Sequence, residues 1–249
     1  MKNKTVLITG GGSGIGKAAA HLFAEKGHTV YIVGRRGALL EETAASHPGH
    51  IIPLKADVAD AGDRAKIAAA VGEPLGALIH NAAILGPITD TLSIPEEEWR
   101  RVMEINLNAP LFLTQQLLPA LREARVLHIS SGAAHYPIAS WGAYCASKAA
   151  LNMMYRILRE EHSRPGIRFG SLRPGIVDTE MQAHIRGGDR RRFPHLEKFH
   201  QFYKEGALVP AGEVAAFIYW VVTATDDALF EAEEWDIRDE RYLDKWKTK

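Results

Sequence analysis

The sequence predicts an α/β fold with a doubly wound, mostly parallel sheet and helices on both of its faces. Three observations carry this prediction. Strand-like apolar runs alternate with helical patterns, a glycine cluster separates the first strand from the first helix, and no shift in composition divides the 249 residues. Alternating strands and helices favour a parallel sheet whose ligand lies across the carboxyl ends of the strands. Because α/β chains of this length often remain undivided, we expect residues 1–249 to form a single domain.

The first predicted elements form a βαβ unit. Residues 5–9 are a β-branched run that stops at a glycine cluster, residues 10–16, and apolar residues at helical spacing follow until Gly27. A second apolar run covers residues 28–33. Strand, glycine turn, helix and strand in this order are typical of such a unit.

The glycine cluster predicts a phosphate-binding loop. Glycines at 10, 14 and 16 let the backbone turn tightly and approach a pyrophosphate, which the first amides and the dipole of the helix then stabilise. A glycine-rich turn without a ligand is the alternative, and the flanking strand and helix favour the phosphate site. The predicted cofactor-binding residues of this Rossmann-type loop are Gly10, Gly12, Ser13, Gly14, Ile15 and Gly16.

Four more strands are expected, at residues 51–54, 75–80, 125–130 and 168–172. Helical patterns cover residues 61–71, the stretch from Pro95 toward Leu121, and residues 146–158. The acidic first turn after Pro95 suits the positive end of a helix dipole. These assignments predict a sheet of six strands.

The end of the second predicted strand bears on the choice of cofactor. In a dinucleotide site an acidic residue there binds the ribose hydroxyls, whereas an arginine accommodates a 2′-phosphate. This chain has Gly34 followed by Arg35 and Arg36. A guanidinium makes charge-assisted bonds to a phosphate that NAD lacks, so the sequence favours NADP(H). The alternative is that both arginines are solvated loop residues.

A serine, a tyrosine and a lysine form the candidate catalytic set. Ser131 follows the fifth predicted strand, and Tyr144 and Lys148 are four residues apart on a predicted helix, so the latter two share one helical face. Hydride transfer to a ketone leaves negative charge on the carbonyl oxygen, which then needs a proton. Tyr144 is the predicted proton donor in reduction and the base in oxidation. We expect Lys148 and an oxidised nicotinamide to lower its pKa.

These motifs resemble the short-chain dehydrogenase/reductase family. The resemblance rests on the Gly-x-x-x-Gly-x-Gly spacing, on Ser131 with Tyr144-x-x-x-Lys148, and on further segments that occur in the family's order along nearly the whole chain. It implies that Lys148 binds the nicotinamide ribose and that Ser131 hydrogen-bonds the substrate oxygen. It also implies that Asn106 is a fourth catalytic residue, holding a water that connects the lysine to solvent. Further cofactor contacts implied by the resemblance are Asp57, Val58, Asn81, Ala82, Ala83, Pro174, Gly175, Val177 and Thr179.

The block around Trp141 resembles one branch of that family, which contains sepiapterin reductases and bacterial benzil reductases. This resemblance implies NADPH-dependent reduction of vicinal dicarbonyls. The predicted substrate contacts are Ser131, Trp141, Met181 and Asp236. Asp236 falls where sepiapterin reductases carry a pterin-anchoring aspartate, and the alternative is a surface acid that ends an edge strand.

Residues 180–209 are predicted to form a lid over the substrate. Their apolar side chains recur at roughly helical spacing, as expected of a segment that packs over a site. They are Met181, Phe193, Leu196, Phe199, Phe202 and Tyr203. A basic cluster in the same segment, Arg186 and residues 190–192, is either a solvated hinge or an anion site.

Composition excludes several classes of protein. Thirty basic and thirty acidic residues balance, so neither nucleic acid nor a membrane surface is an expected partner. Cys145 is the only cysteine, which leaves no internal disulfide, and we expect it to be a packed side chain. The eleven histidines, His135 among them, lack metal-ligand spacing, so no metal is expected. Without a signal peptide or a long apolar run, the expected location is the cytoplasm.

The function predicted from these features is an NADPH-dependent carbonyl reductase acting on a small ketone, with vicinal dicarbonyls as the preferred class. Two alternatives stay open. One is an enzyme of the same family that acts on another alcohol–ketone pair, such as a 3-oxoacyl thioester, a sugar or a steroid. The other is a regulator that binds NADP without turnover. The resemblance also implies a homodimer or homotetramer, formed through the helices that carry Asn106 and Tyr144.

Overall fold

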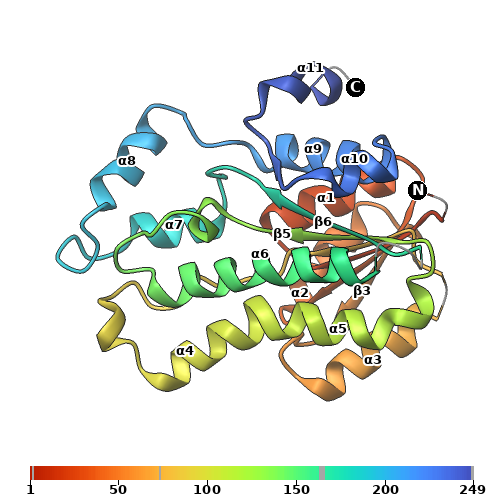
Figure 1. Cartoon of the computed structure of the whole chain (residues 1–249), viewed down its shortest axis with the longest axis horizontal. Coiled ribbons are helices and arrows are strands. Elements are labelled where there is room, and N and C mark those ends of the chain that lie inside the picture. The colour runs from red at the N-terminus through yellow and green to blue at the C-terminus, as the bar shows by residue number, and fades with distance from the viewer. Residues whose placement is uncertain (2, 73, 163–165, 248–249) are drawn as a thin grey trace.

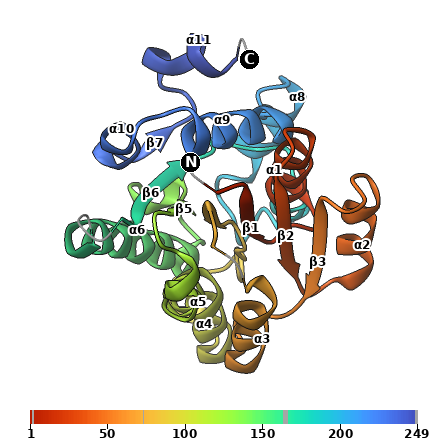
Figure 2. The same cartoon turned by 90° about the vertical axis from the view of Figure 1, so that its right-hand side faces the viewer.

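A seven-stranded parallel sheet forms the centre of the fold in this computed structural model, which describes residues 1, 3–72, 74–162 and 166–247. The strands lie in the order β3-β2-β1-β4-β5-β6-β7, with helices on both faces of the sheet (Figures 1 and 2). The direction of winding reverses between β1 and β4, and ligands of such sheets bind in the crevice at that point. The predicted fold class is confirmed.

The strands are β1 (Thr5–Thr9), β2 (Thr29–Gly34), β3 (Ile51–Lys55), β4 (Ala77–His80), β5 (Arg125–Ile129), β6 (Arg168–Arg173) and β7 (Trp235–Asp236). The main helices are α1 (Gly14–Glu25), α2 (Gly37–Ala45), α3 (Ala61–Val71), α4 (Glu96–Met103), α5 (Ala109–Leu117), α6 (Gly142–His162), α7 (Glu180–Arg186), α8 (Leu196–Lys204), α9 (Ala211–Thr223), α10 (Asp227–Ala232) and α11 (Leu243–Trp246). Short helical turns are η1 (Thr91–Ser93), η2 (Glu104–Asn108), η3 (Leu118–Ala120), η4 (Gly132–Ala134) and η5 (Glu240–Tyr242). Among the described helices, none is long and apolar enough to cross a membrane.

Two apolar layers attach the helices to the sheet. Successive strand residues point to opposite faces, so Val6 packs with Phe23 of α1 and Phe217 of α9, whereas Leu7 packs with Leu113 of α5 on the other side. Every residue of β1 is buried, as expected for a central parallel strand that helices cover on both faces. Burial of β1 fixes the loop that follows it at the crevice.

The predicted number of strands is wrong. All six predicted strands are present within two residues of their expected ends, but β7 adds a seventh, which pairs in parallel with β6 through Leu172↔Trp235 and Arg173↔Asp236. A two-residue strand is too short to show the alternation on which sequence prediction depends.

The long helix expected after Pro95 is also interrupted. A π-helical turn, η2, separates α4 from α5 and carries Asn106. Turns of this kind inside helices are frequent at functional sites, and η2 packs against α6 next to the cavity described below.

Candidate active site

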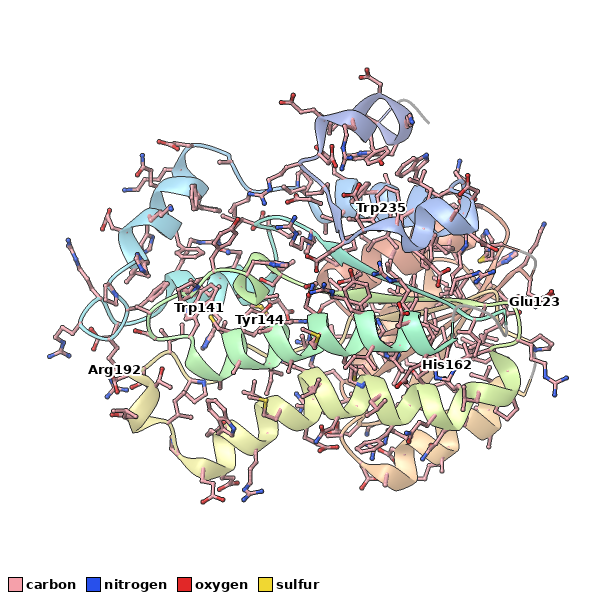
Figure 3. All side chains as sticks on the ribbon, in the orientation of Figure 1. Glu123, Trp141, Tyr144, His162, Arg192 and Trp235 are labelled. Atoms are coloured by element: carbon pink, nitrogen blue, oxygen red, sulfur yellow. The ribbon has the colours of Figure 1, made fainter. Side chains whose placement is uncertain are left out.

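A cavity of about 870 Å³ lies at the carboxyl ends of the strands, walled by the loops after β1 to β6 and by part of the segment 180–209. All of the predicted site residues line it except Gly16, Asn106 and Asp236. Trp141 and Tyr144 lie close together at the start of α6, facing α7 (Figure 3). The fold therefore brings the predicted cofactor loop and the predicted catalytic set into one site.

The glycine loop has the shape that a pyrophosphate needs. Gly10 and Gly14 adopt positive φ angles of 72° and 53°, which side chains of other residues rarely tolerate. A Cβ at Gly16 would come within 2.2 Å of the Gly10 carbonyl oxygen, so glycine at this position permits close packing of the helix on the loop. Ser13 precedes α1 without capping it through its side chain, which leaves the first amides of the helix for a ligand.

Asn81 fixes the loop to the neighbouring strand. Its side-chain amide donates hydrogen bonds to the carbonyl oxygens of Thr9 (2.9 Å) and Gly10 (3.3 Å). The Thr9 hydroxyl in turn accepts from the backbone amides of Asn81 and Ala82, both at 3.0 Å. These bonds join the ends of β1 and β4 at the winding reversal, so the cradle exists before any ligand arrives.

The catalytic set converges from two elements. Ser131 follows β5, and its hydroxyl lies near enough to that of Tyr144 to exert a lowering effect on the Tyr144 pKa. On α6, the Nζ of Lys148 lies 5.8 Å from the centre of the Tyr144 ring and donates a 2.8 Å hydrogen bond to the carbonyl oxygen of Ile129. Tyr144 and Lys148 are both more than nine-tenths buried. A substrate oxygen at this point would meet two hydroxyl groups beside an ammonium group.

The direction predicted for the Tyr144 pKa is wrong in the free protein. Burial raises the pKa of Tyr144 to about 12, because desolvation of the phenolate outweighs the lowering effect of the Ser131 hydroxyl. Burial also lowers the pKa of Lys148 to about 8. At neutral pH Tyr144 therefore keeps its proton and Lys148 keeps its charge, which is the protonation state that a proton donor requires.

Asn106 uses its side chain to fasten a loop to the catalytic helix. Its Oδ1 accepts from the backbone amide of Ile84 (2.9 Å), and its Nδ2 donates to the carbonyl oxygen of Ile84 (2.8 Å) and to the Ser147 hydroxyl (3.0 Å). These bonds use both protons of the buried amide and one of the two acceptor positions of its oxygen. The structure thus gives Asn106 a positioning part, and the expected contact with a water beside Lys148 stays a prediction.

The two arginines after β2 differ in their surroundings. Arg35 is half exposed and lies 3.9 Å from the Asp57 carboxylate. Arg36 donates 2.8 Å hydrogen bonds to the Ser13 hydroxyl and to the Glu180 carboxylate. Both arginines line the cavity, as do Asp57 and Val58.

Aromatic side chains form the other half of the cavity. The Trp141 ring lies edge-on to Tyr144 at 5.9 Å and stacks on Phe193 at 5.6 Å. Phe199 of α8 packs against the same ring at 5.4 Å. The Trp141 indole is 6% exposed, and among the described residues its Nε1 has no hydrogen-bond partner.

The segment 180–209 packs over this aromatic group, and the two ends of the segment lie next to each other. Val177 and Val209 pair at its base, and the Ser140 hydroxyl donates a 2.6 Å hydrogen bond to the carbonyl oxygen of Arg192. Arg186 packs over the Tyr203 ring at 4.1 Å. Arg186 and the arginines 190–192 do not lie among the described residues of the cavity wall, whereas His184 of the same segment does.

Asp236 is the one predicted substrate contact that the structure places outside the cavity wall. Its carboxylate accepts bidentate hydrogen bonds of 3.0 and 2.7 Å from Arg238 and pairs with Arg173 at 3.2 Å. Two guanidinium groups already occupy the carboxylate, so a substrate would have to replace one of them, and a direct contact of Asp236 with substrate stays a prediction. Arg173 and Arg238, together with Tyr136, line the cavity instead.

Sequence reasoning missed Arg173, Arg238, Tyr136 and Glu180. Arg173 ends β6 next to the predicted Pro174, so its position at a strand end was a usable signal. Arg238 and Tyr136 reach the cavity from loops whose course no local pattern indicates. Glu180 follows the predicted Thr179, but its bond to Arg36 joins residues 144 positions apart.

A glycine cradle for a pyrophosphate and a buried proton donor beside a lysine, on a doubly wound sheet, define a nicotinamide-dependent oxidoreductase. The family described as short chain dehydrogenase matches residues 4–189, and the chain belongs to that family. The described residues contain no group of three or more His, Cys, Asp or Glu side chains that could hold a metal ion.

Individual proteins show the same relationship. The chain is 31% identical over 211 residues to benzil reductase ((S)-benzoin forming) of Bacillus subtilis, covering 81% of this chain and 86% of the relative. It is 31% identical over 226 residues to serine 3-dehydrogenase of Rhizobium radiobacter, covering 88% of each. The structure of a short chain dehydrogenase/reductase from Saccharomyces cerevisiae superposes with a TM-score of 0.90 at 26% identity, covering 97% of this chain and 99% of that one.

Proposed function

We propose that the protein is an NADPH-dependent carbonyl reductase that acts on ketones, preferably vicinal dicarbonyls, with Tyr144 as the proton donor. The observation that carries this proposal is the convergence of Ser131, Tyr144 and the buried Lys148 in the same cavity as the glycine loop. A binding protein without turnover has no need of this arrangement, which argues against the non-catalytic alternative.

Each member of the set has a separate task. A nicotinamide cofactor supplies the hydride when bound. Tyr144 is protonated at neutral pH and donates its proton to the carbonyl oxygen as negative charge develops there. Ser131 donates a hydrogen bond to the same oxygen and orients it. Lys148 remains charged below about pH 8, so its ammonium can bind ribose hydroxyls and favour the phenolate after the proton has left.

The preference for NADPH rests on Gly34, Arg35 and Arg36. Glycine at the end of β2 removes the carboxylate that would bind unphosphorylated ribose hydroxyls. Two guanidinium groups follow, and both line the cavity. A phosphate dianion accepts bidentate, charge-assisted hydrogen bonds from such groups.

The preference for dicarbonyls rests on the aromatic half of the cavity. Trp141 and Met181 contribute apolar wall, as an aryl ketone would require. The indole N–H of Trp141 is buried without a partner among the described residues, which is costly. A shift of the ring on substrate binding would offer this donor to the second oxygen of a vicinal dicarbonyl. The likeness to a benzil reductase supports the same substrate class.

A second candidate substrate class is favoured by Arg173 and Arg238. These cationic side chains on the cavity wall could receive a carboxylate, and the likeness to serine 3-dehydrogenase points to a 3-hydroxy acid in that case. Asp236 neutralises part of their charge, which is why we place this candidate second.

Three further expectations belong to the proposal. The segment 180–209 acts as a lid, because it packs over the site while its ends meet at one hinge through Val177 and Val209. The protein assembles as a homodimer or homotetramer, for which the exposed Phe112 of α5 and Met153 and Ile157 of α6 offer an apolar surface. Its place of action is the cytoplasm.

Initial rates with NADPH and with NADH test the proposal directly. Benzil, diacetyl and sepiapterin represent dicarbonyls and related ketones, and a 3-oxoacyl thioester represents a competing ketone. Serine, an alcohol, is assayed in the oxidation direction with NADP⁺ and with NAD⁺. We expect the highest kcat/KM for benzil with NADPH. Turnover confined to the thioester or to serine would contradict the dicarbonyl assignment, and cofactor binding without turnover of any substrate would support a regulator.

A further inference from the structure

Glu180 contacts Arg36, the second of the two arginines that follow β2. The two terminal nitrogens of Arg36 are shared between the Glu180 carboxylate and the Ser13 hydroxyl, each at 2.8 Å. These three residues come from the first residue of α7, the end of the glycine loop and the start of α2, and all of them line the cavity. The guanidinium fork is therefore engaged by groups of this chain itself.

We propose that Glu180 is a cofactor-specificity residue whose carboxylate competes with the 2′-phosphate of NADP for Arg36. This inference rests on the proposed NADPH dependence. A carboxylate and a phosphate bind the same face of a guanidinium through the same parallel N–H donors. Glu180 accepts from one terminal nitrogen of Arg36 and Ser13 from the other, so a phosphate obtains the complete pair of terminal donors only as Glu180 withdraws.

Charge decides which of the two anions wins. A phosphate monoester carries about −1.5 to −2 charge near neutral pH and three acceptor oxygens, whereas a carboxylate carries −1 and two. Ser13 accepts a hydrogen bond from the same guanidinium and keeps its own hydroxyl proton, which it can donate to the phosphate. The phosphate therefore displaces Glu180, but part of its binding free energy is spent in doing so.

The exposure of the Arg36 and Glu180 side chains indicates how strongly Glu180 lowers the affinity for the 2′-phosphate. The side chains of Arg36 and Glu180 are 57% and 64% exposed, and exposed ion pairs are weak because water screens them. Release of the pair should therefore cost the 2′-phosphate roughly a two- to fivefold loss of affinity. An unphosphorylated adenosine makes no demand on the Arg36 fork and should lose nothing through this competition.

Binding of cofactor fragments measures the competition without turnover. Isothermal titration with adenosine 2′,5′-bisphosphate and with adenosine 5′-phosphate reports the contribution of the 2′-phosphate in the wild type and in Glu180→Gln. We expect Glu180→Gln to bind the bisphosphate two- to fivefold more tightly, with the affinity for the monophosphate unchanged. In the double variant Arg36→Ala/Glu180→Gln, compared with Arg36→Ala, this selective gain should vanish.

Glu98→Gln is the matched control. Glu98 lines the same cavity from α4 and is not among the described partners of Arg36, so its loss should leave the ratio of the two affinities unchanged. An equal gain for both fragments in Glu180→Gln, a gain that persists without Arg36, or no gain would each overturn the proposal.

The same titrations separate this proposal from the one on which it rests. If Arg36→Ala lowers the affinity ratio but Glu180→Gln does not raise it, only the competition is refuted. If neither Arg35→Ala nor Arg36→Ala changes the ratio, the assignment of the 2′-phosphate site fails together with it.

Discussion

The ammonium group of Lys148 donates a 2.8 Å hydrogen bond to the carbonyl oxygen of Ile129, the last residue of β5. This bond ties the catalytic helix to the strand that delivers Ser131, so the lysine and the serine are positioned by one contact between elements. It also leaves the Lys148 ammonium buried without a carboxylate among its charge partners. Burial alone lowers its pKa to about 8, which brings its titration close to physiological pH.

A pH dependence of cofactor use follows from Lys148. As pH rises through about 8, the free protein loses the Lys148 charge, so kcat/KM for NADPH in the reduction direction should fall above that pH. Tyr144 does not interfere, because its pKa lies near 12. Lys148→Arg keeps its charge at all these pH values and should remove the inflection from whatever activity remains. An unchanged inflection in that variant would assign the titration to another group.

Removal of the Tyr144 hydroxyl should separate binding from chemistry. In Tyr144→Phe the ring still packs against Trp141, so NADPH binding measured by fluorescence should be retained. The loss of a positioned proton donor should lower kcat by roughly 100- to 10,000-fold. A matched thermal melt excludes misfolding as the cause. Full turnover by a folded Tyr144→Phe variant would remove this residue from the proposed mechanism.

Arg35 should distinguish the two nicotinamide cofactors. Arg35→Ala removes a half-exposed guanidinium that lines the cavity 3.9 Å from Asp57. Loss of hydrogen bonds to a charged phosphate should raise the KM for NADPH roughly 10- to 100-fold. The KM for NADH should change little. Equal losses with both cofactors would refute a contact with the 2′-phosphate.

Trp141 should discriminate between substrates through its indole N–H. Trp141→Phe keeps an aromatic ring for Phe193 and Tyr144 but deletes the donor, so kcat/KM should fall roughly three- to tenfold for benzil and much less for a monoketone such as acetophenone. Trp246→Phe is the control, because Trp246 also has a buried Nε1 without a partner among the described residues but lies on α11 away from the cavity. A parallel loss for both ketones would show that only packing was changed.

Two buried histidines should make the fold sensitive to acid. The rings of His80 and His128 stack at 5.1 Å between the strands β4 and β5. Burial lowers the pKa of His128 to about 4 and that of His80 well below its usual value. Stability from these neutral rings is present above the unfolded pKa of about 6.5 and is lost as pH falls toward 4, because the unfolded chain binds protons first.

Urea unfolding at pH 7.5 and at pH 5 measures this effect. His128 alone should account for about 2 kcal/mol of the stability lost at pH 5. His128→Phe, which can still stack with His80 and Phe169, should flatten the dependence, whereas removal of the exposed His50 should leave it unchanged. The idea fails if the His128 variant loses as much stability in acid as the wild type.

Local pattern was sufficient for most of the fold. The strands β1 to β6 have apolar runs that turn residues interrupt, and parallel burial on both faces makes such runs conspicuous. β7 and the π-helical turn η2 were not predictable, because two residues carry no periodicity and a single extra residue in a helix leaves the apolar spacing nearly unchanged. The site residues on strand ends, such as Ser131 and Asn81, were predictable because the carboxyl ends of parallel strands meet at one edge.

The sequence by itself determined which groups of this protein could carry out the chemistry: a glycine loop, two arginines after β2, and the Ser131, Tyr144 and Lys148 set. Only the tertiary structure decided the protonation and the ion pairing of the site residues. Burial raised the pKa of Tyr144 instead of lowering it. Folding also paired Asp236 with Arg173 and Arg238, and Glu180 with Arg36. Residue spacing encodes neighbours on one helix or strand, whereas burial and ion pairing depend on segments that meet only when the whole chain has folded.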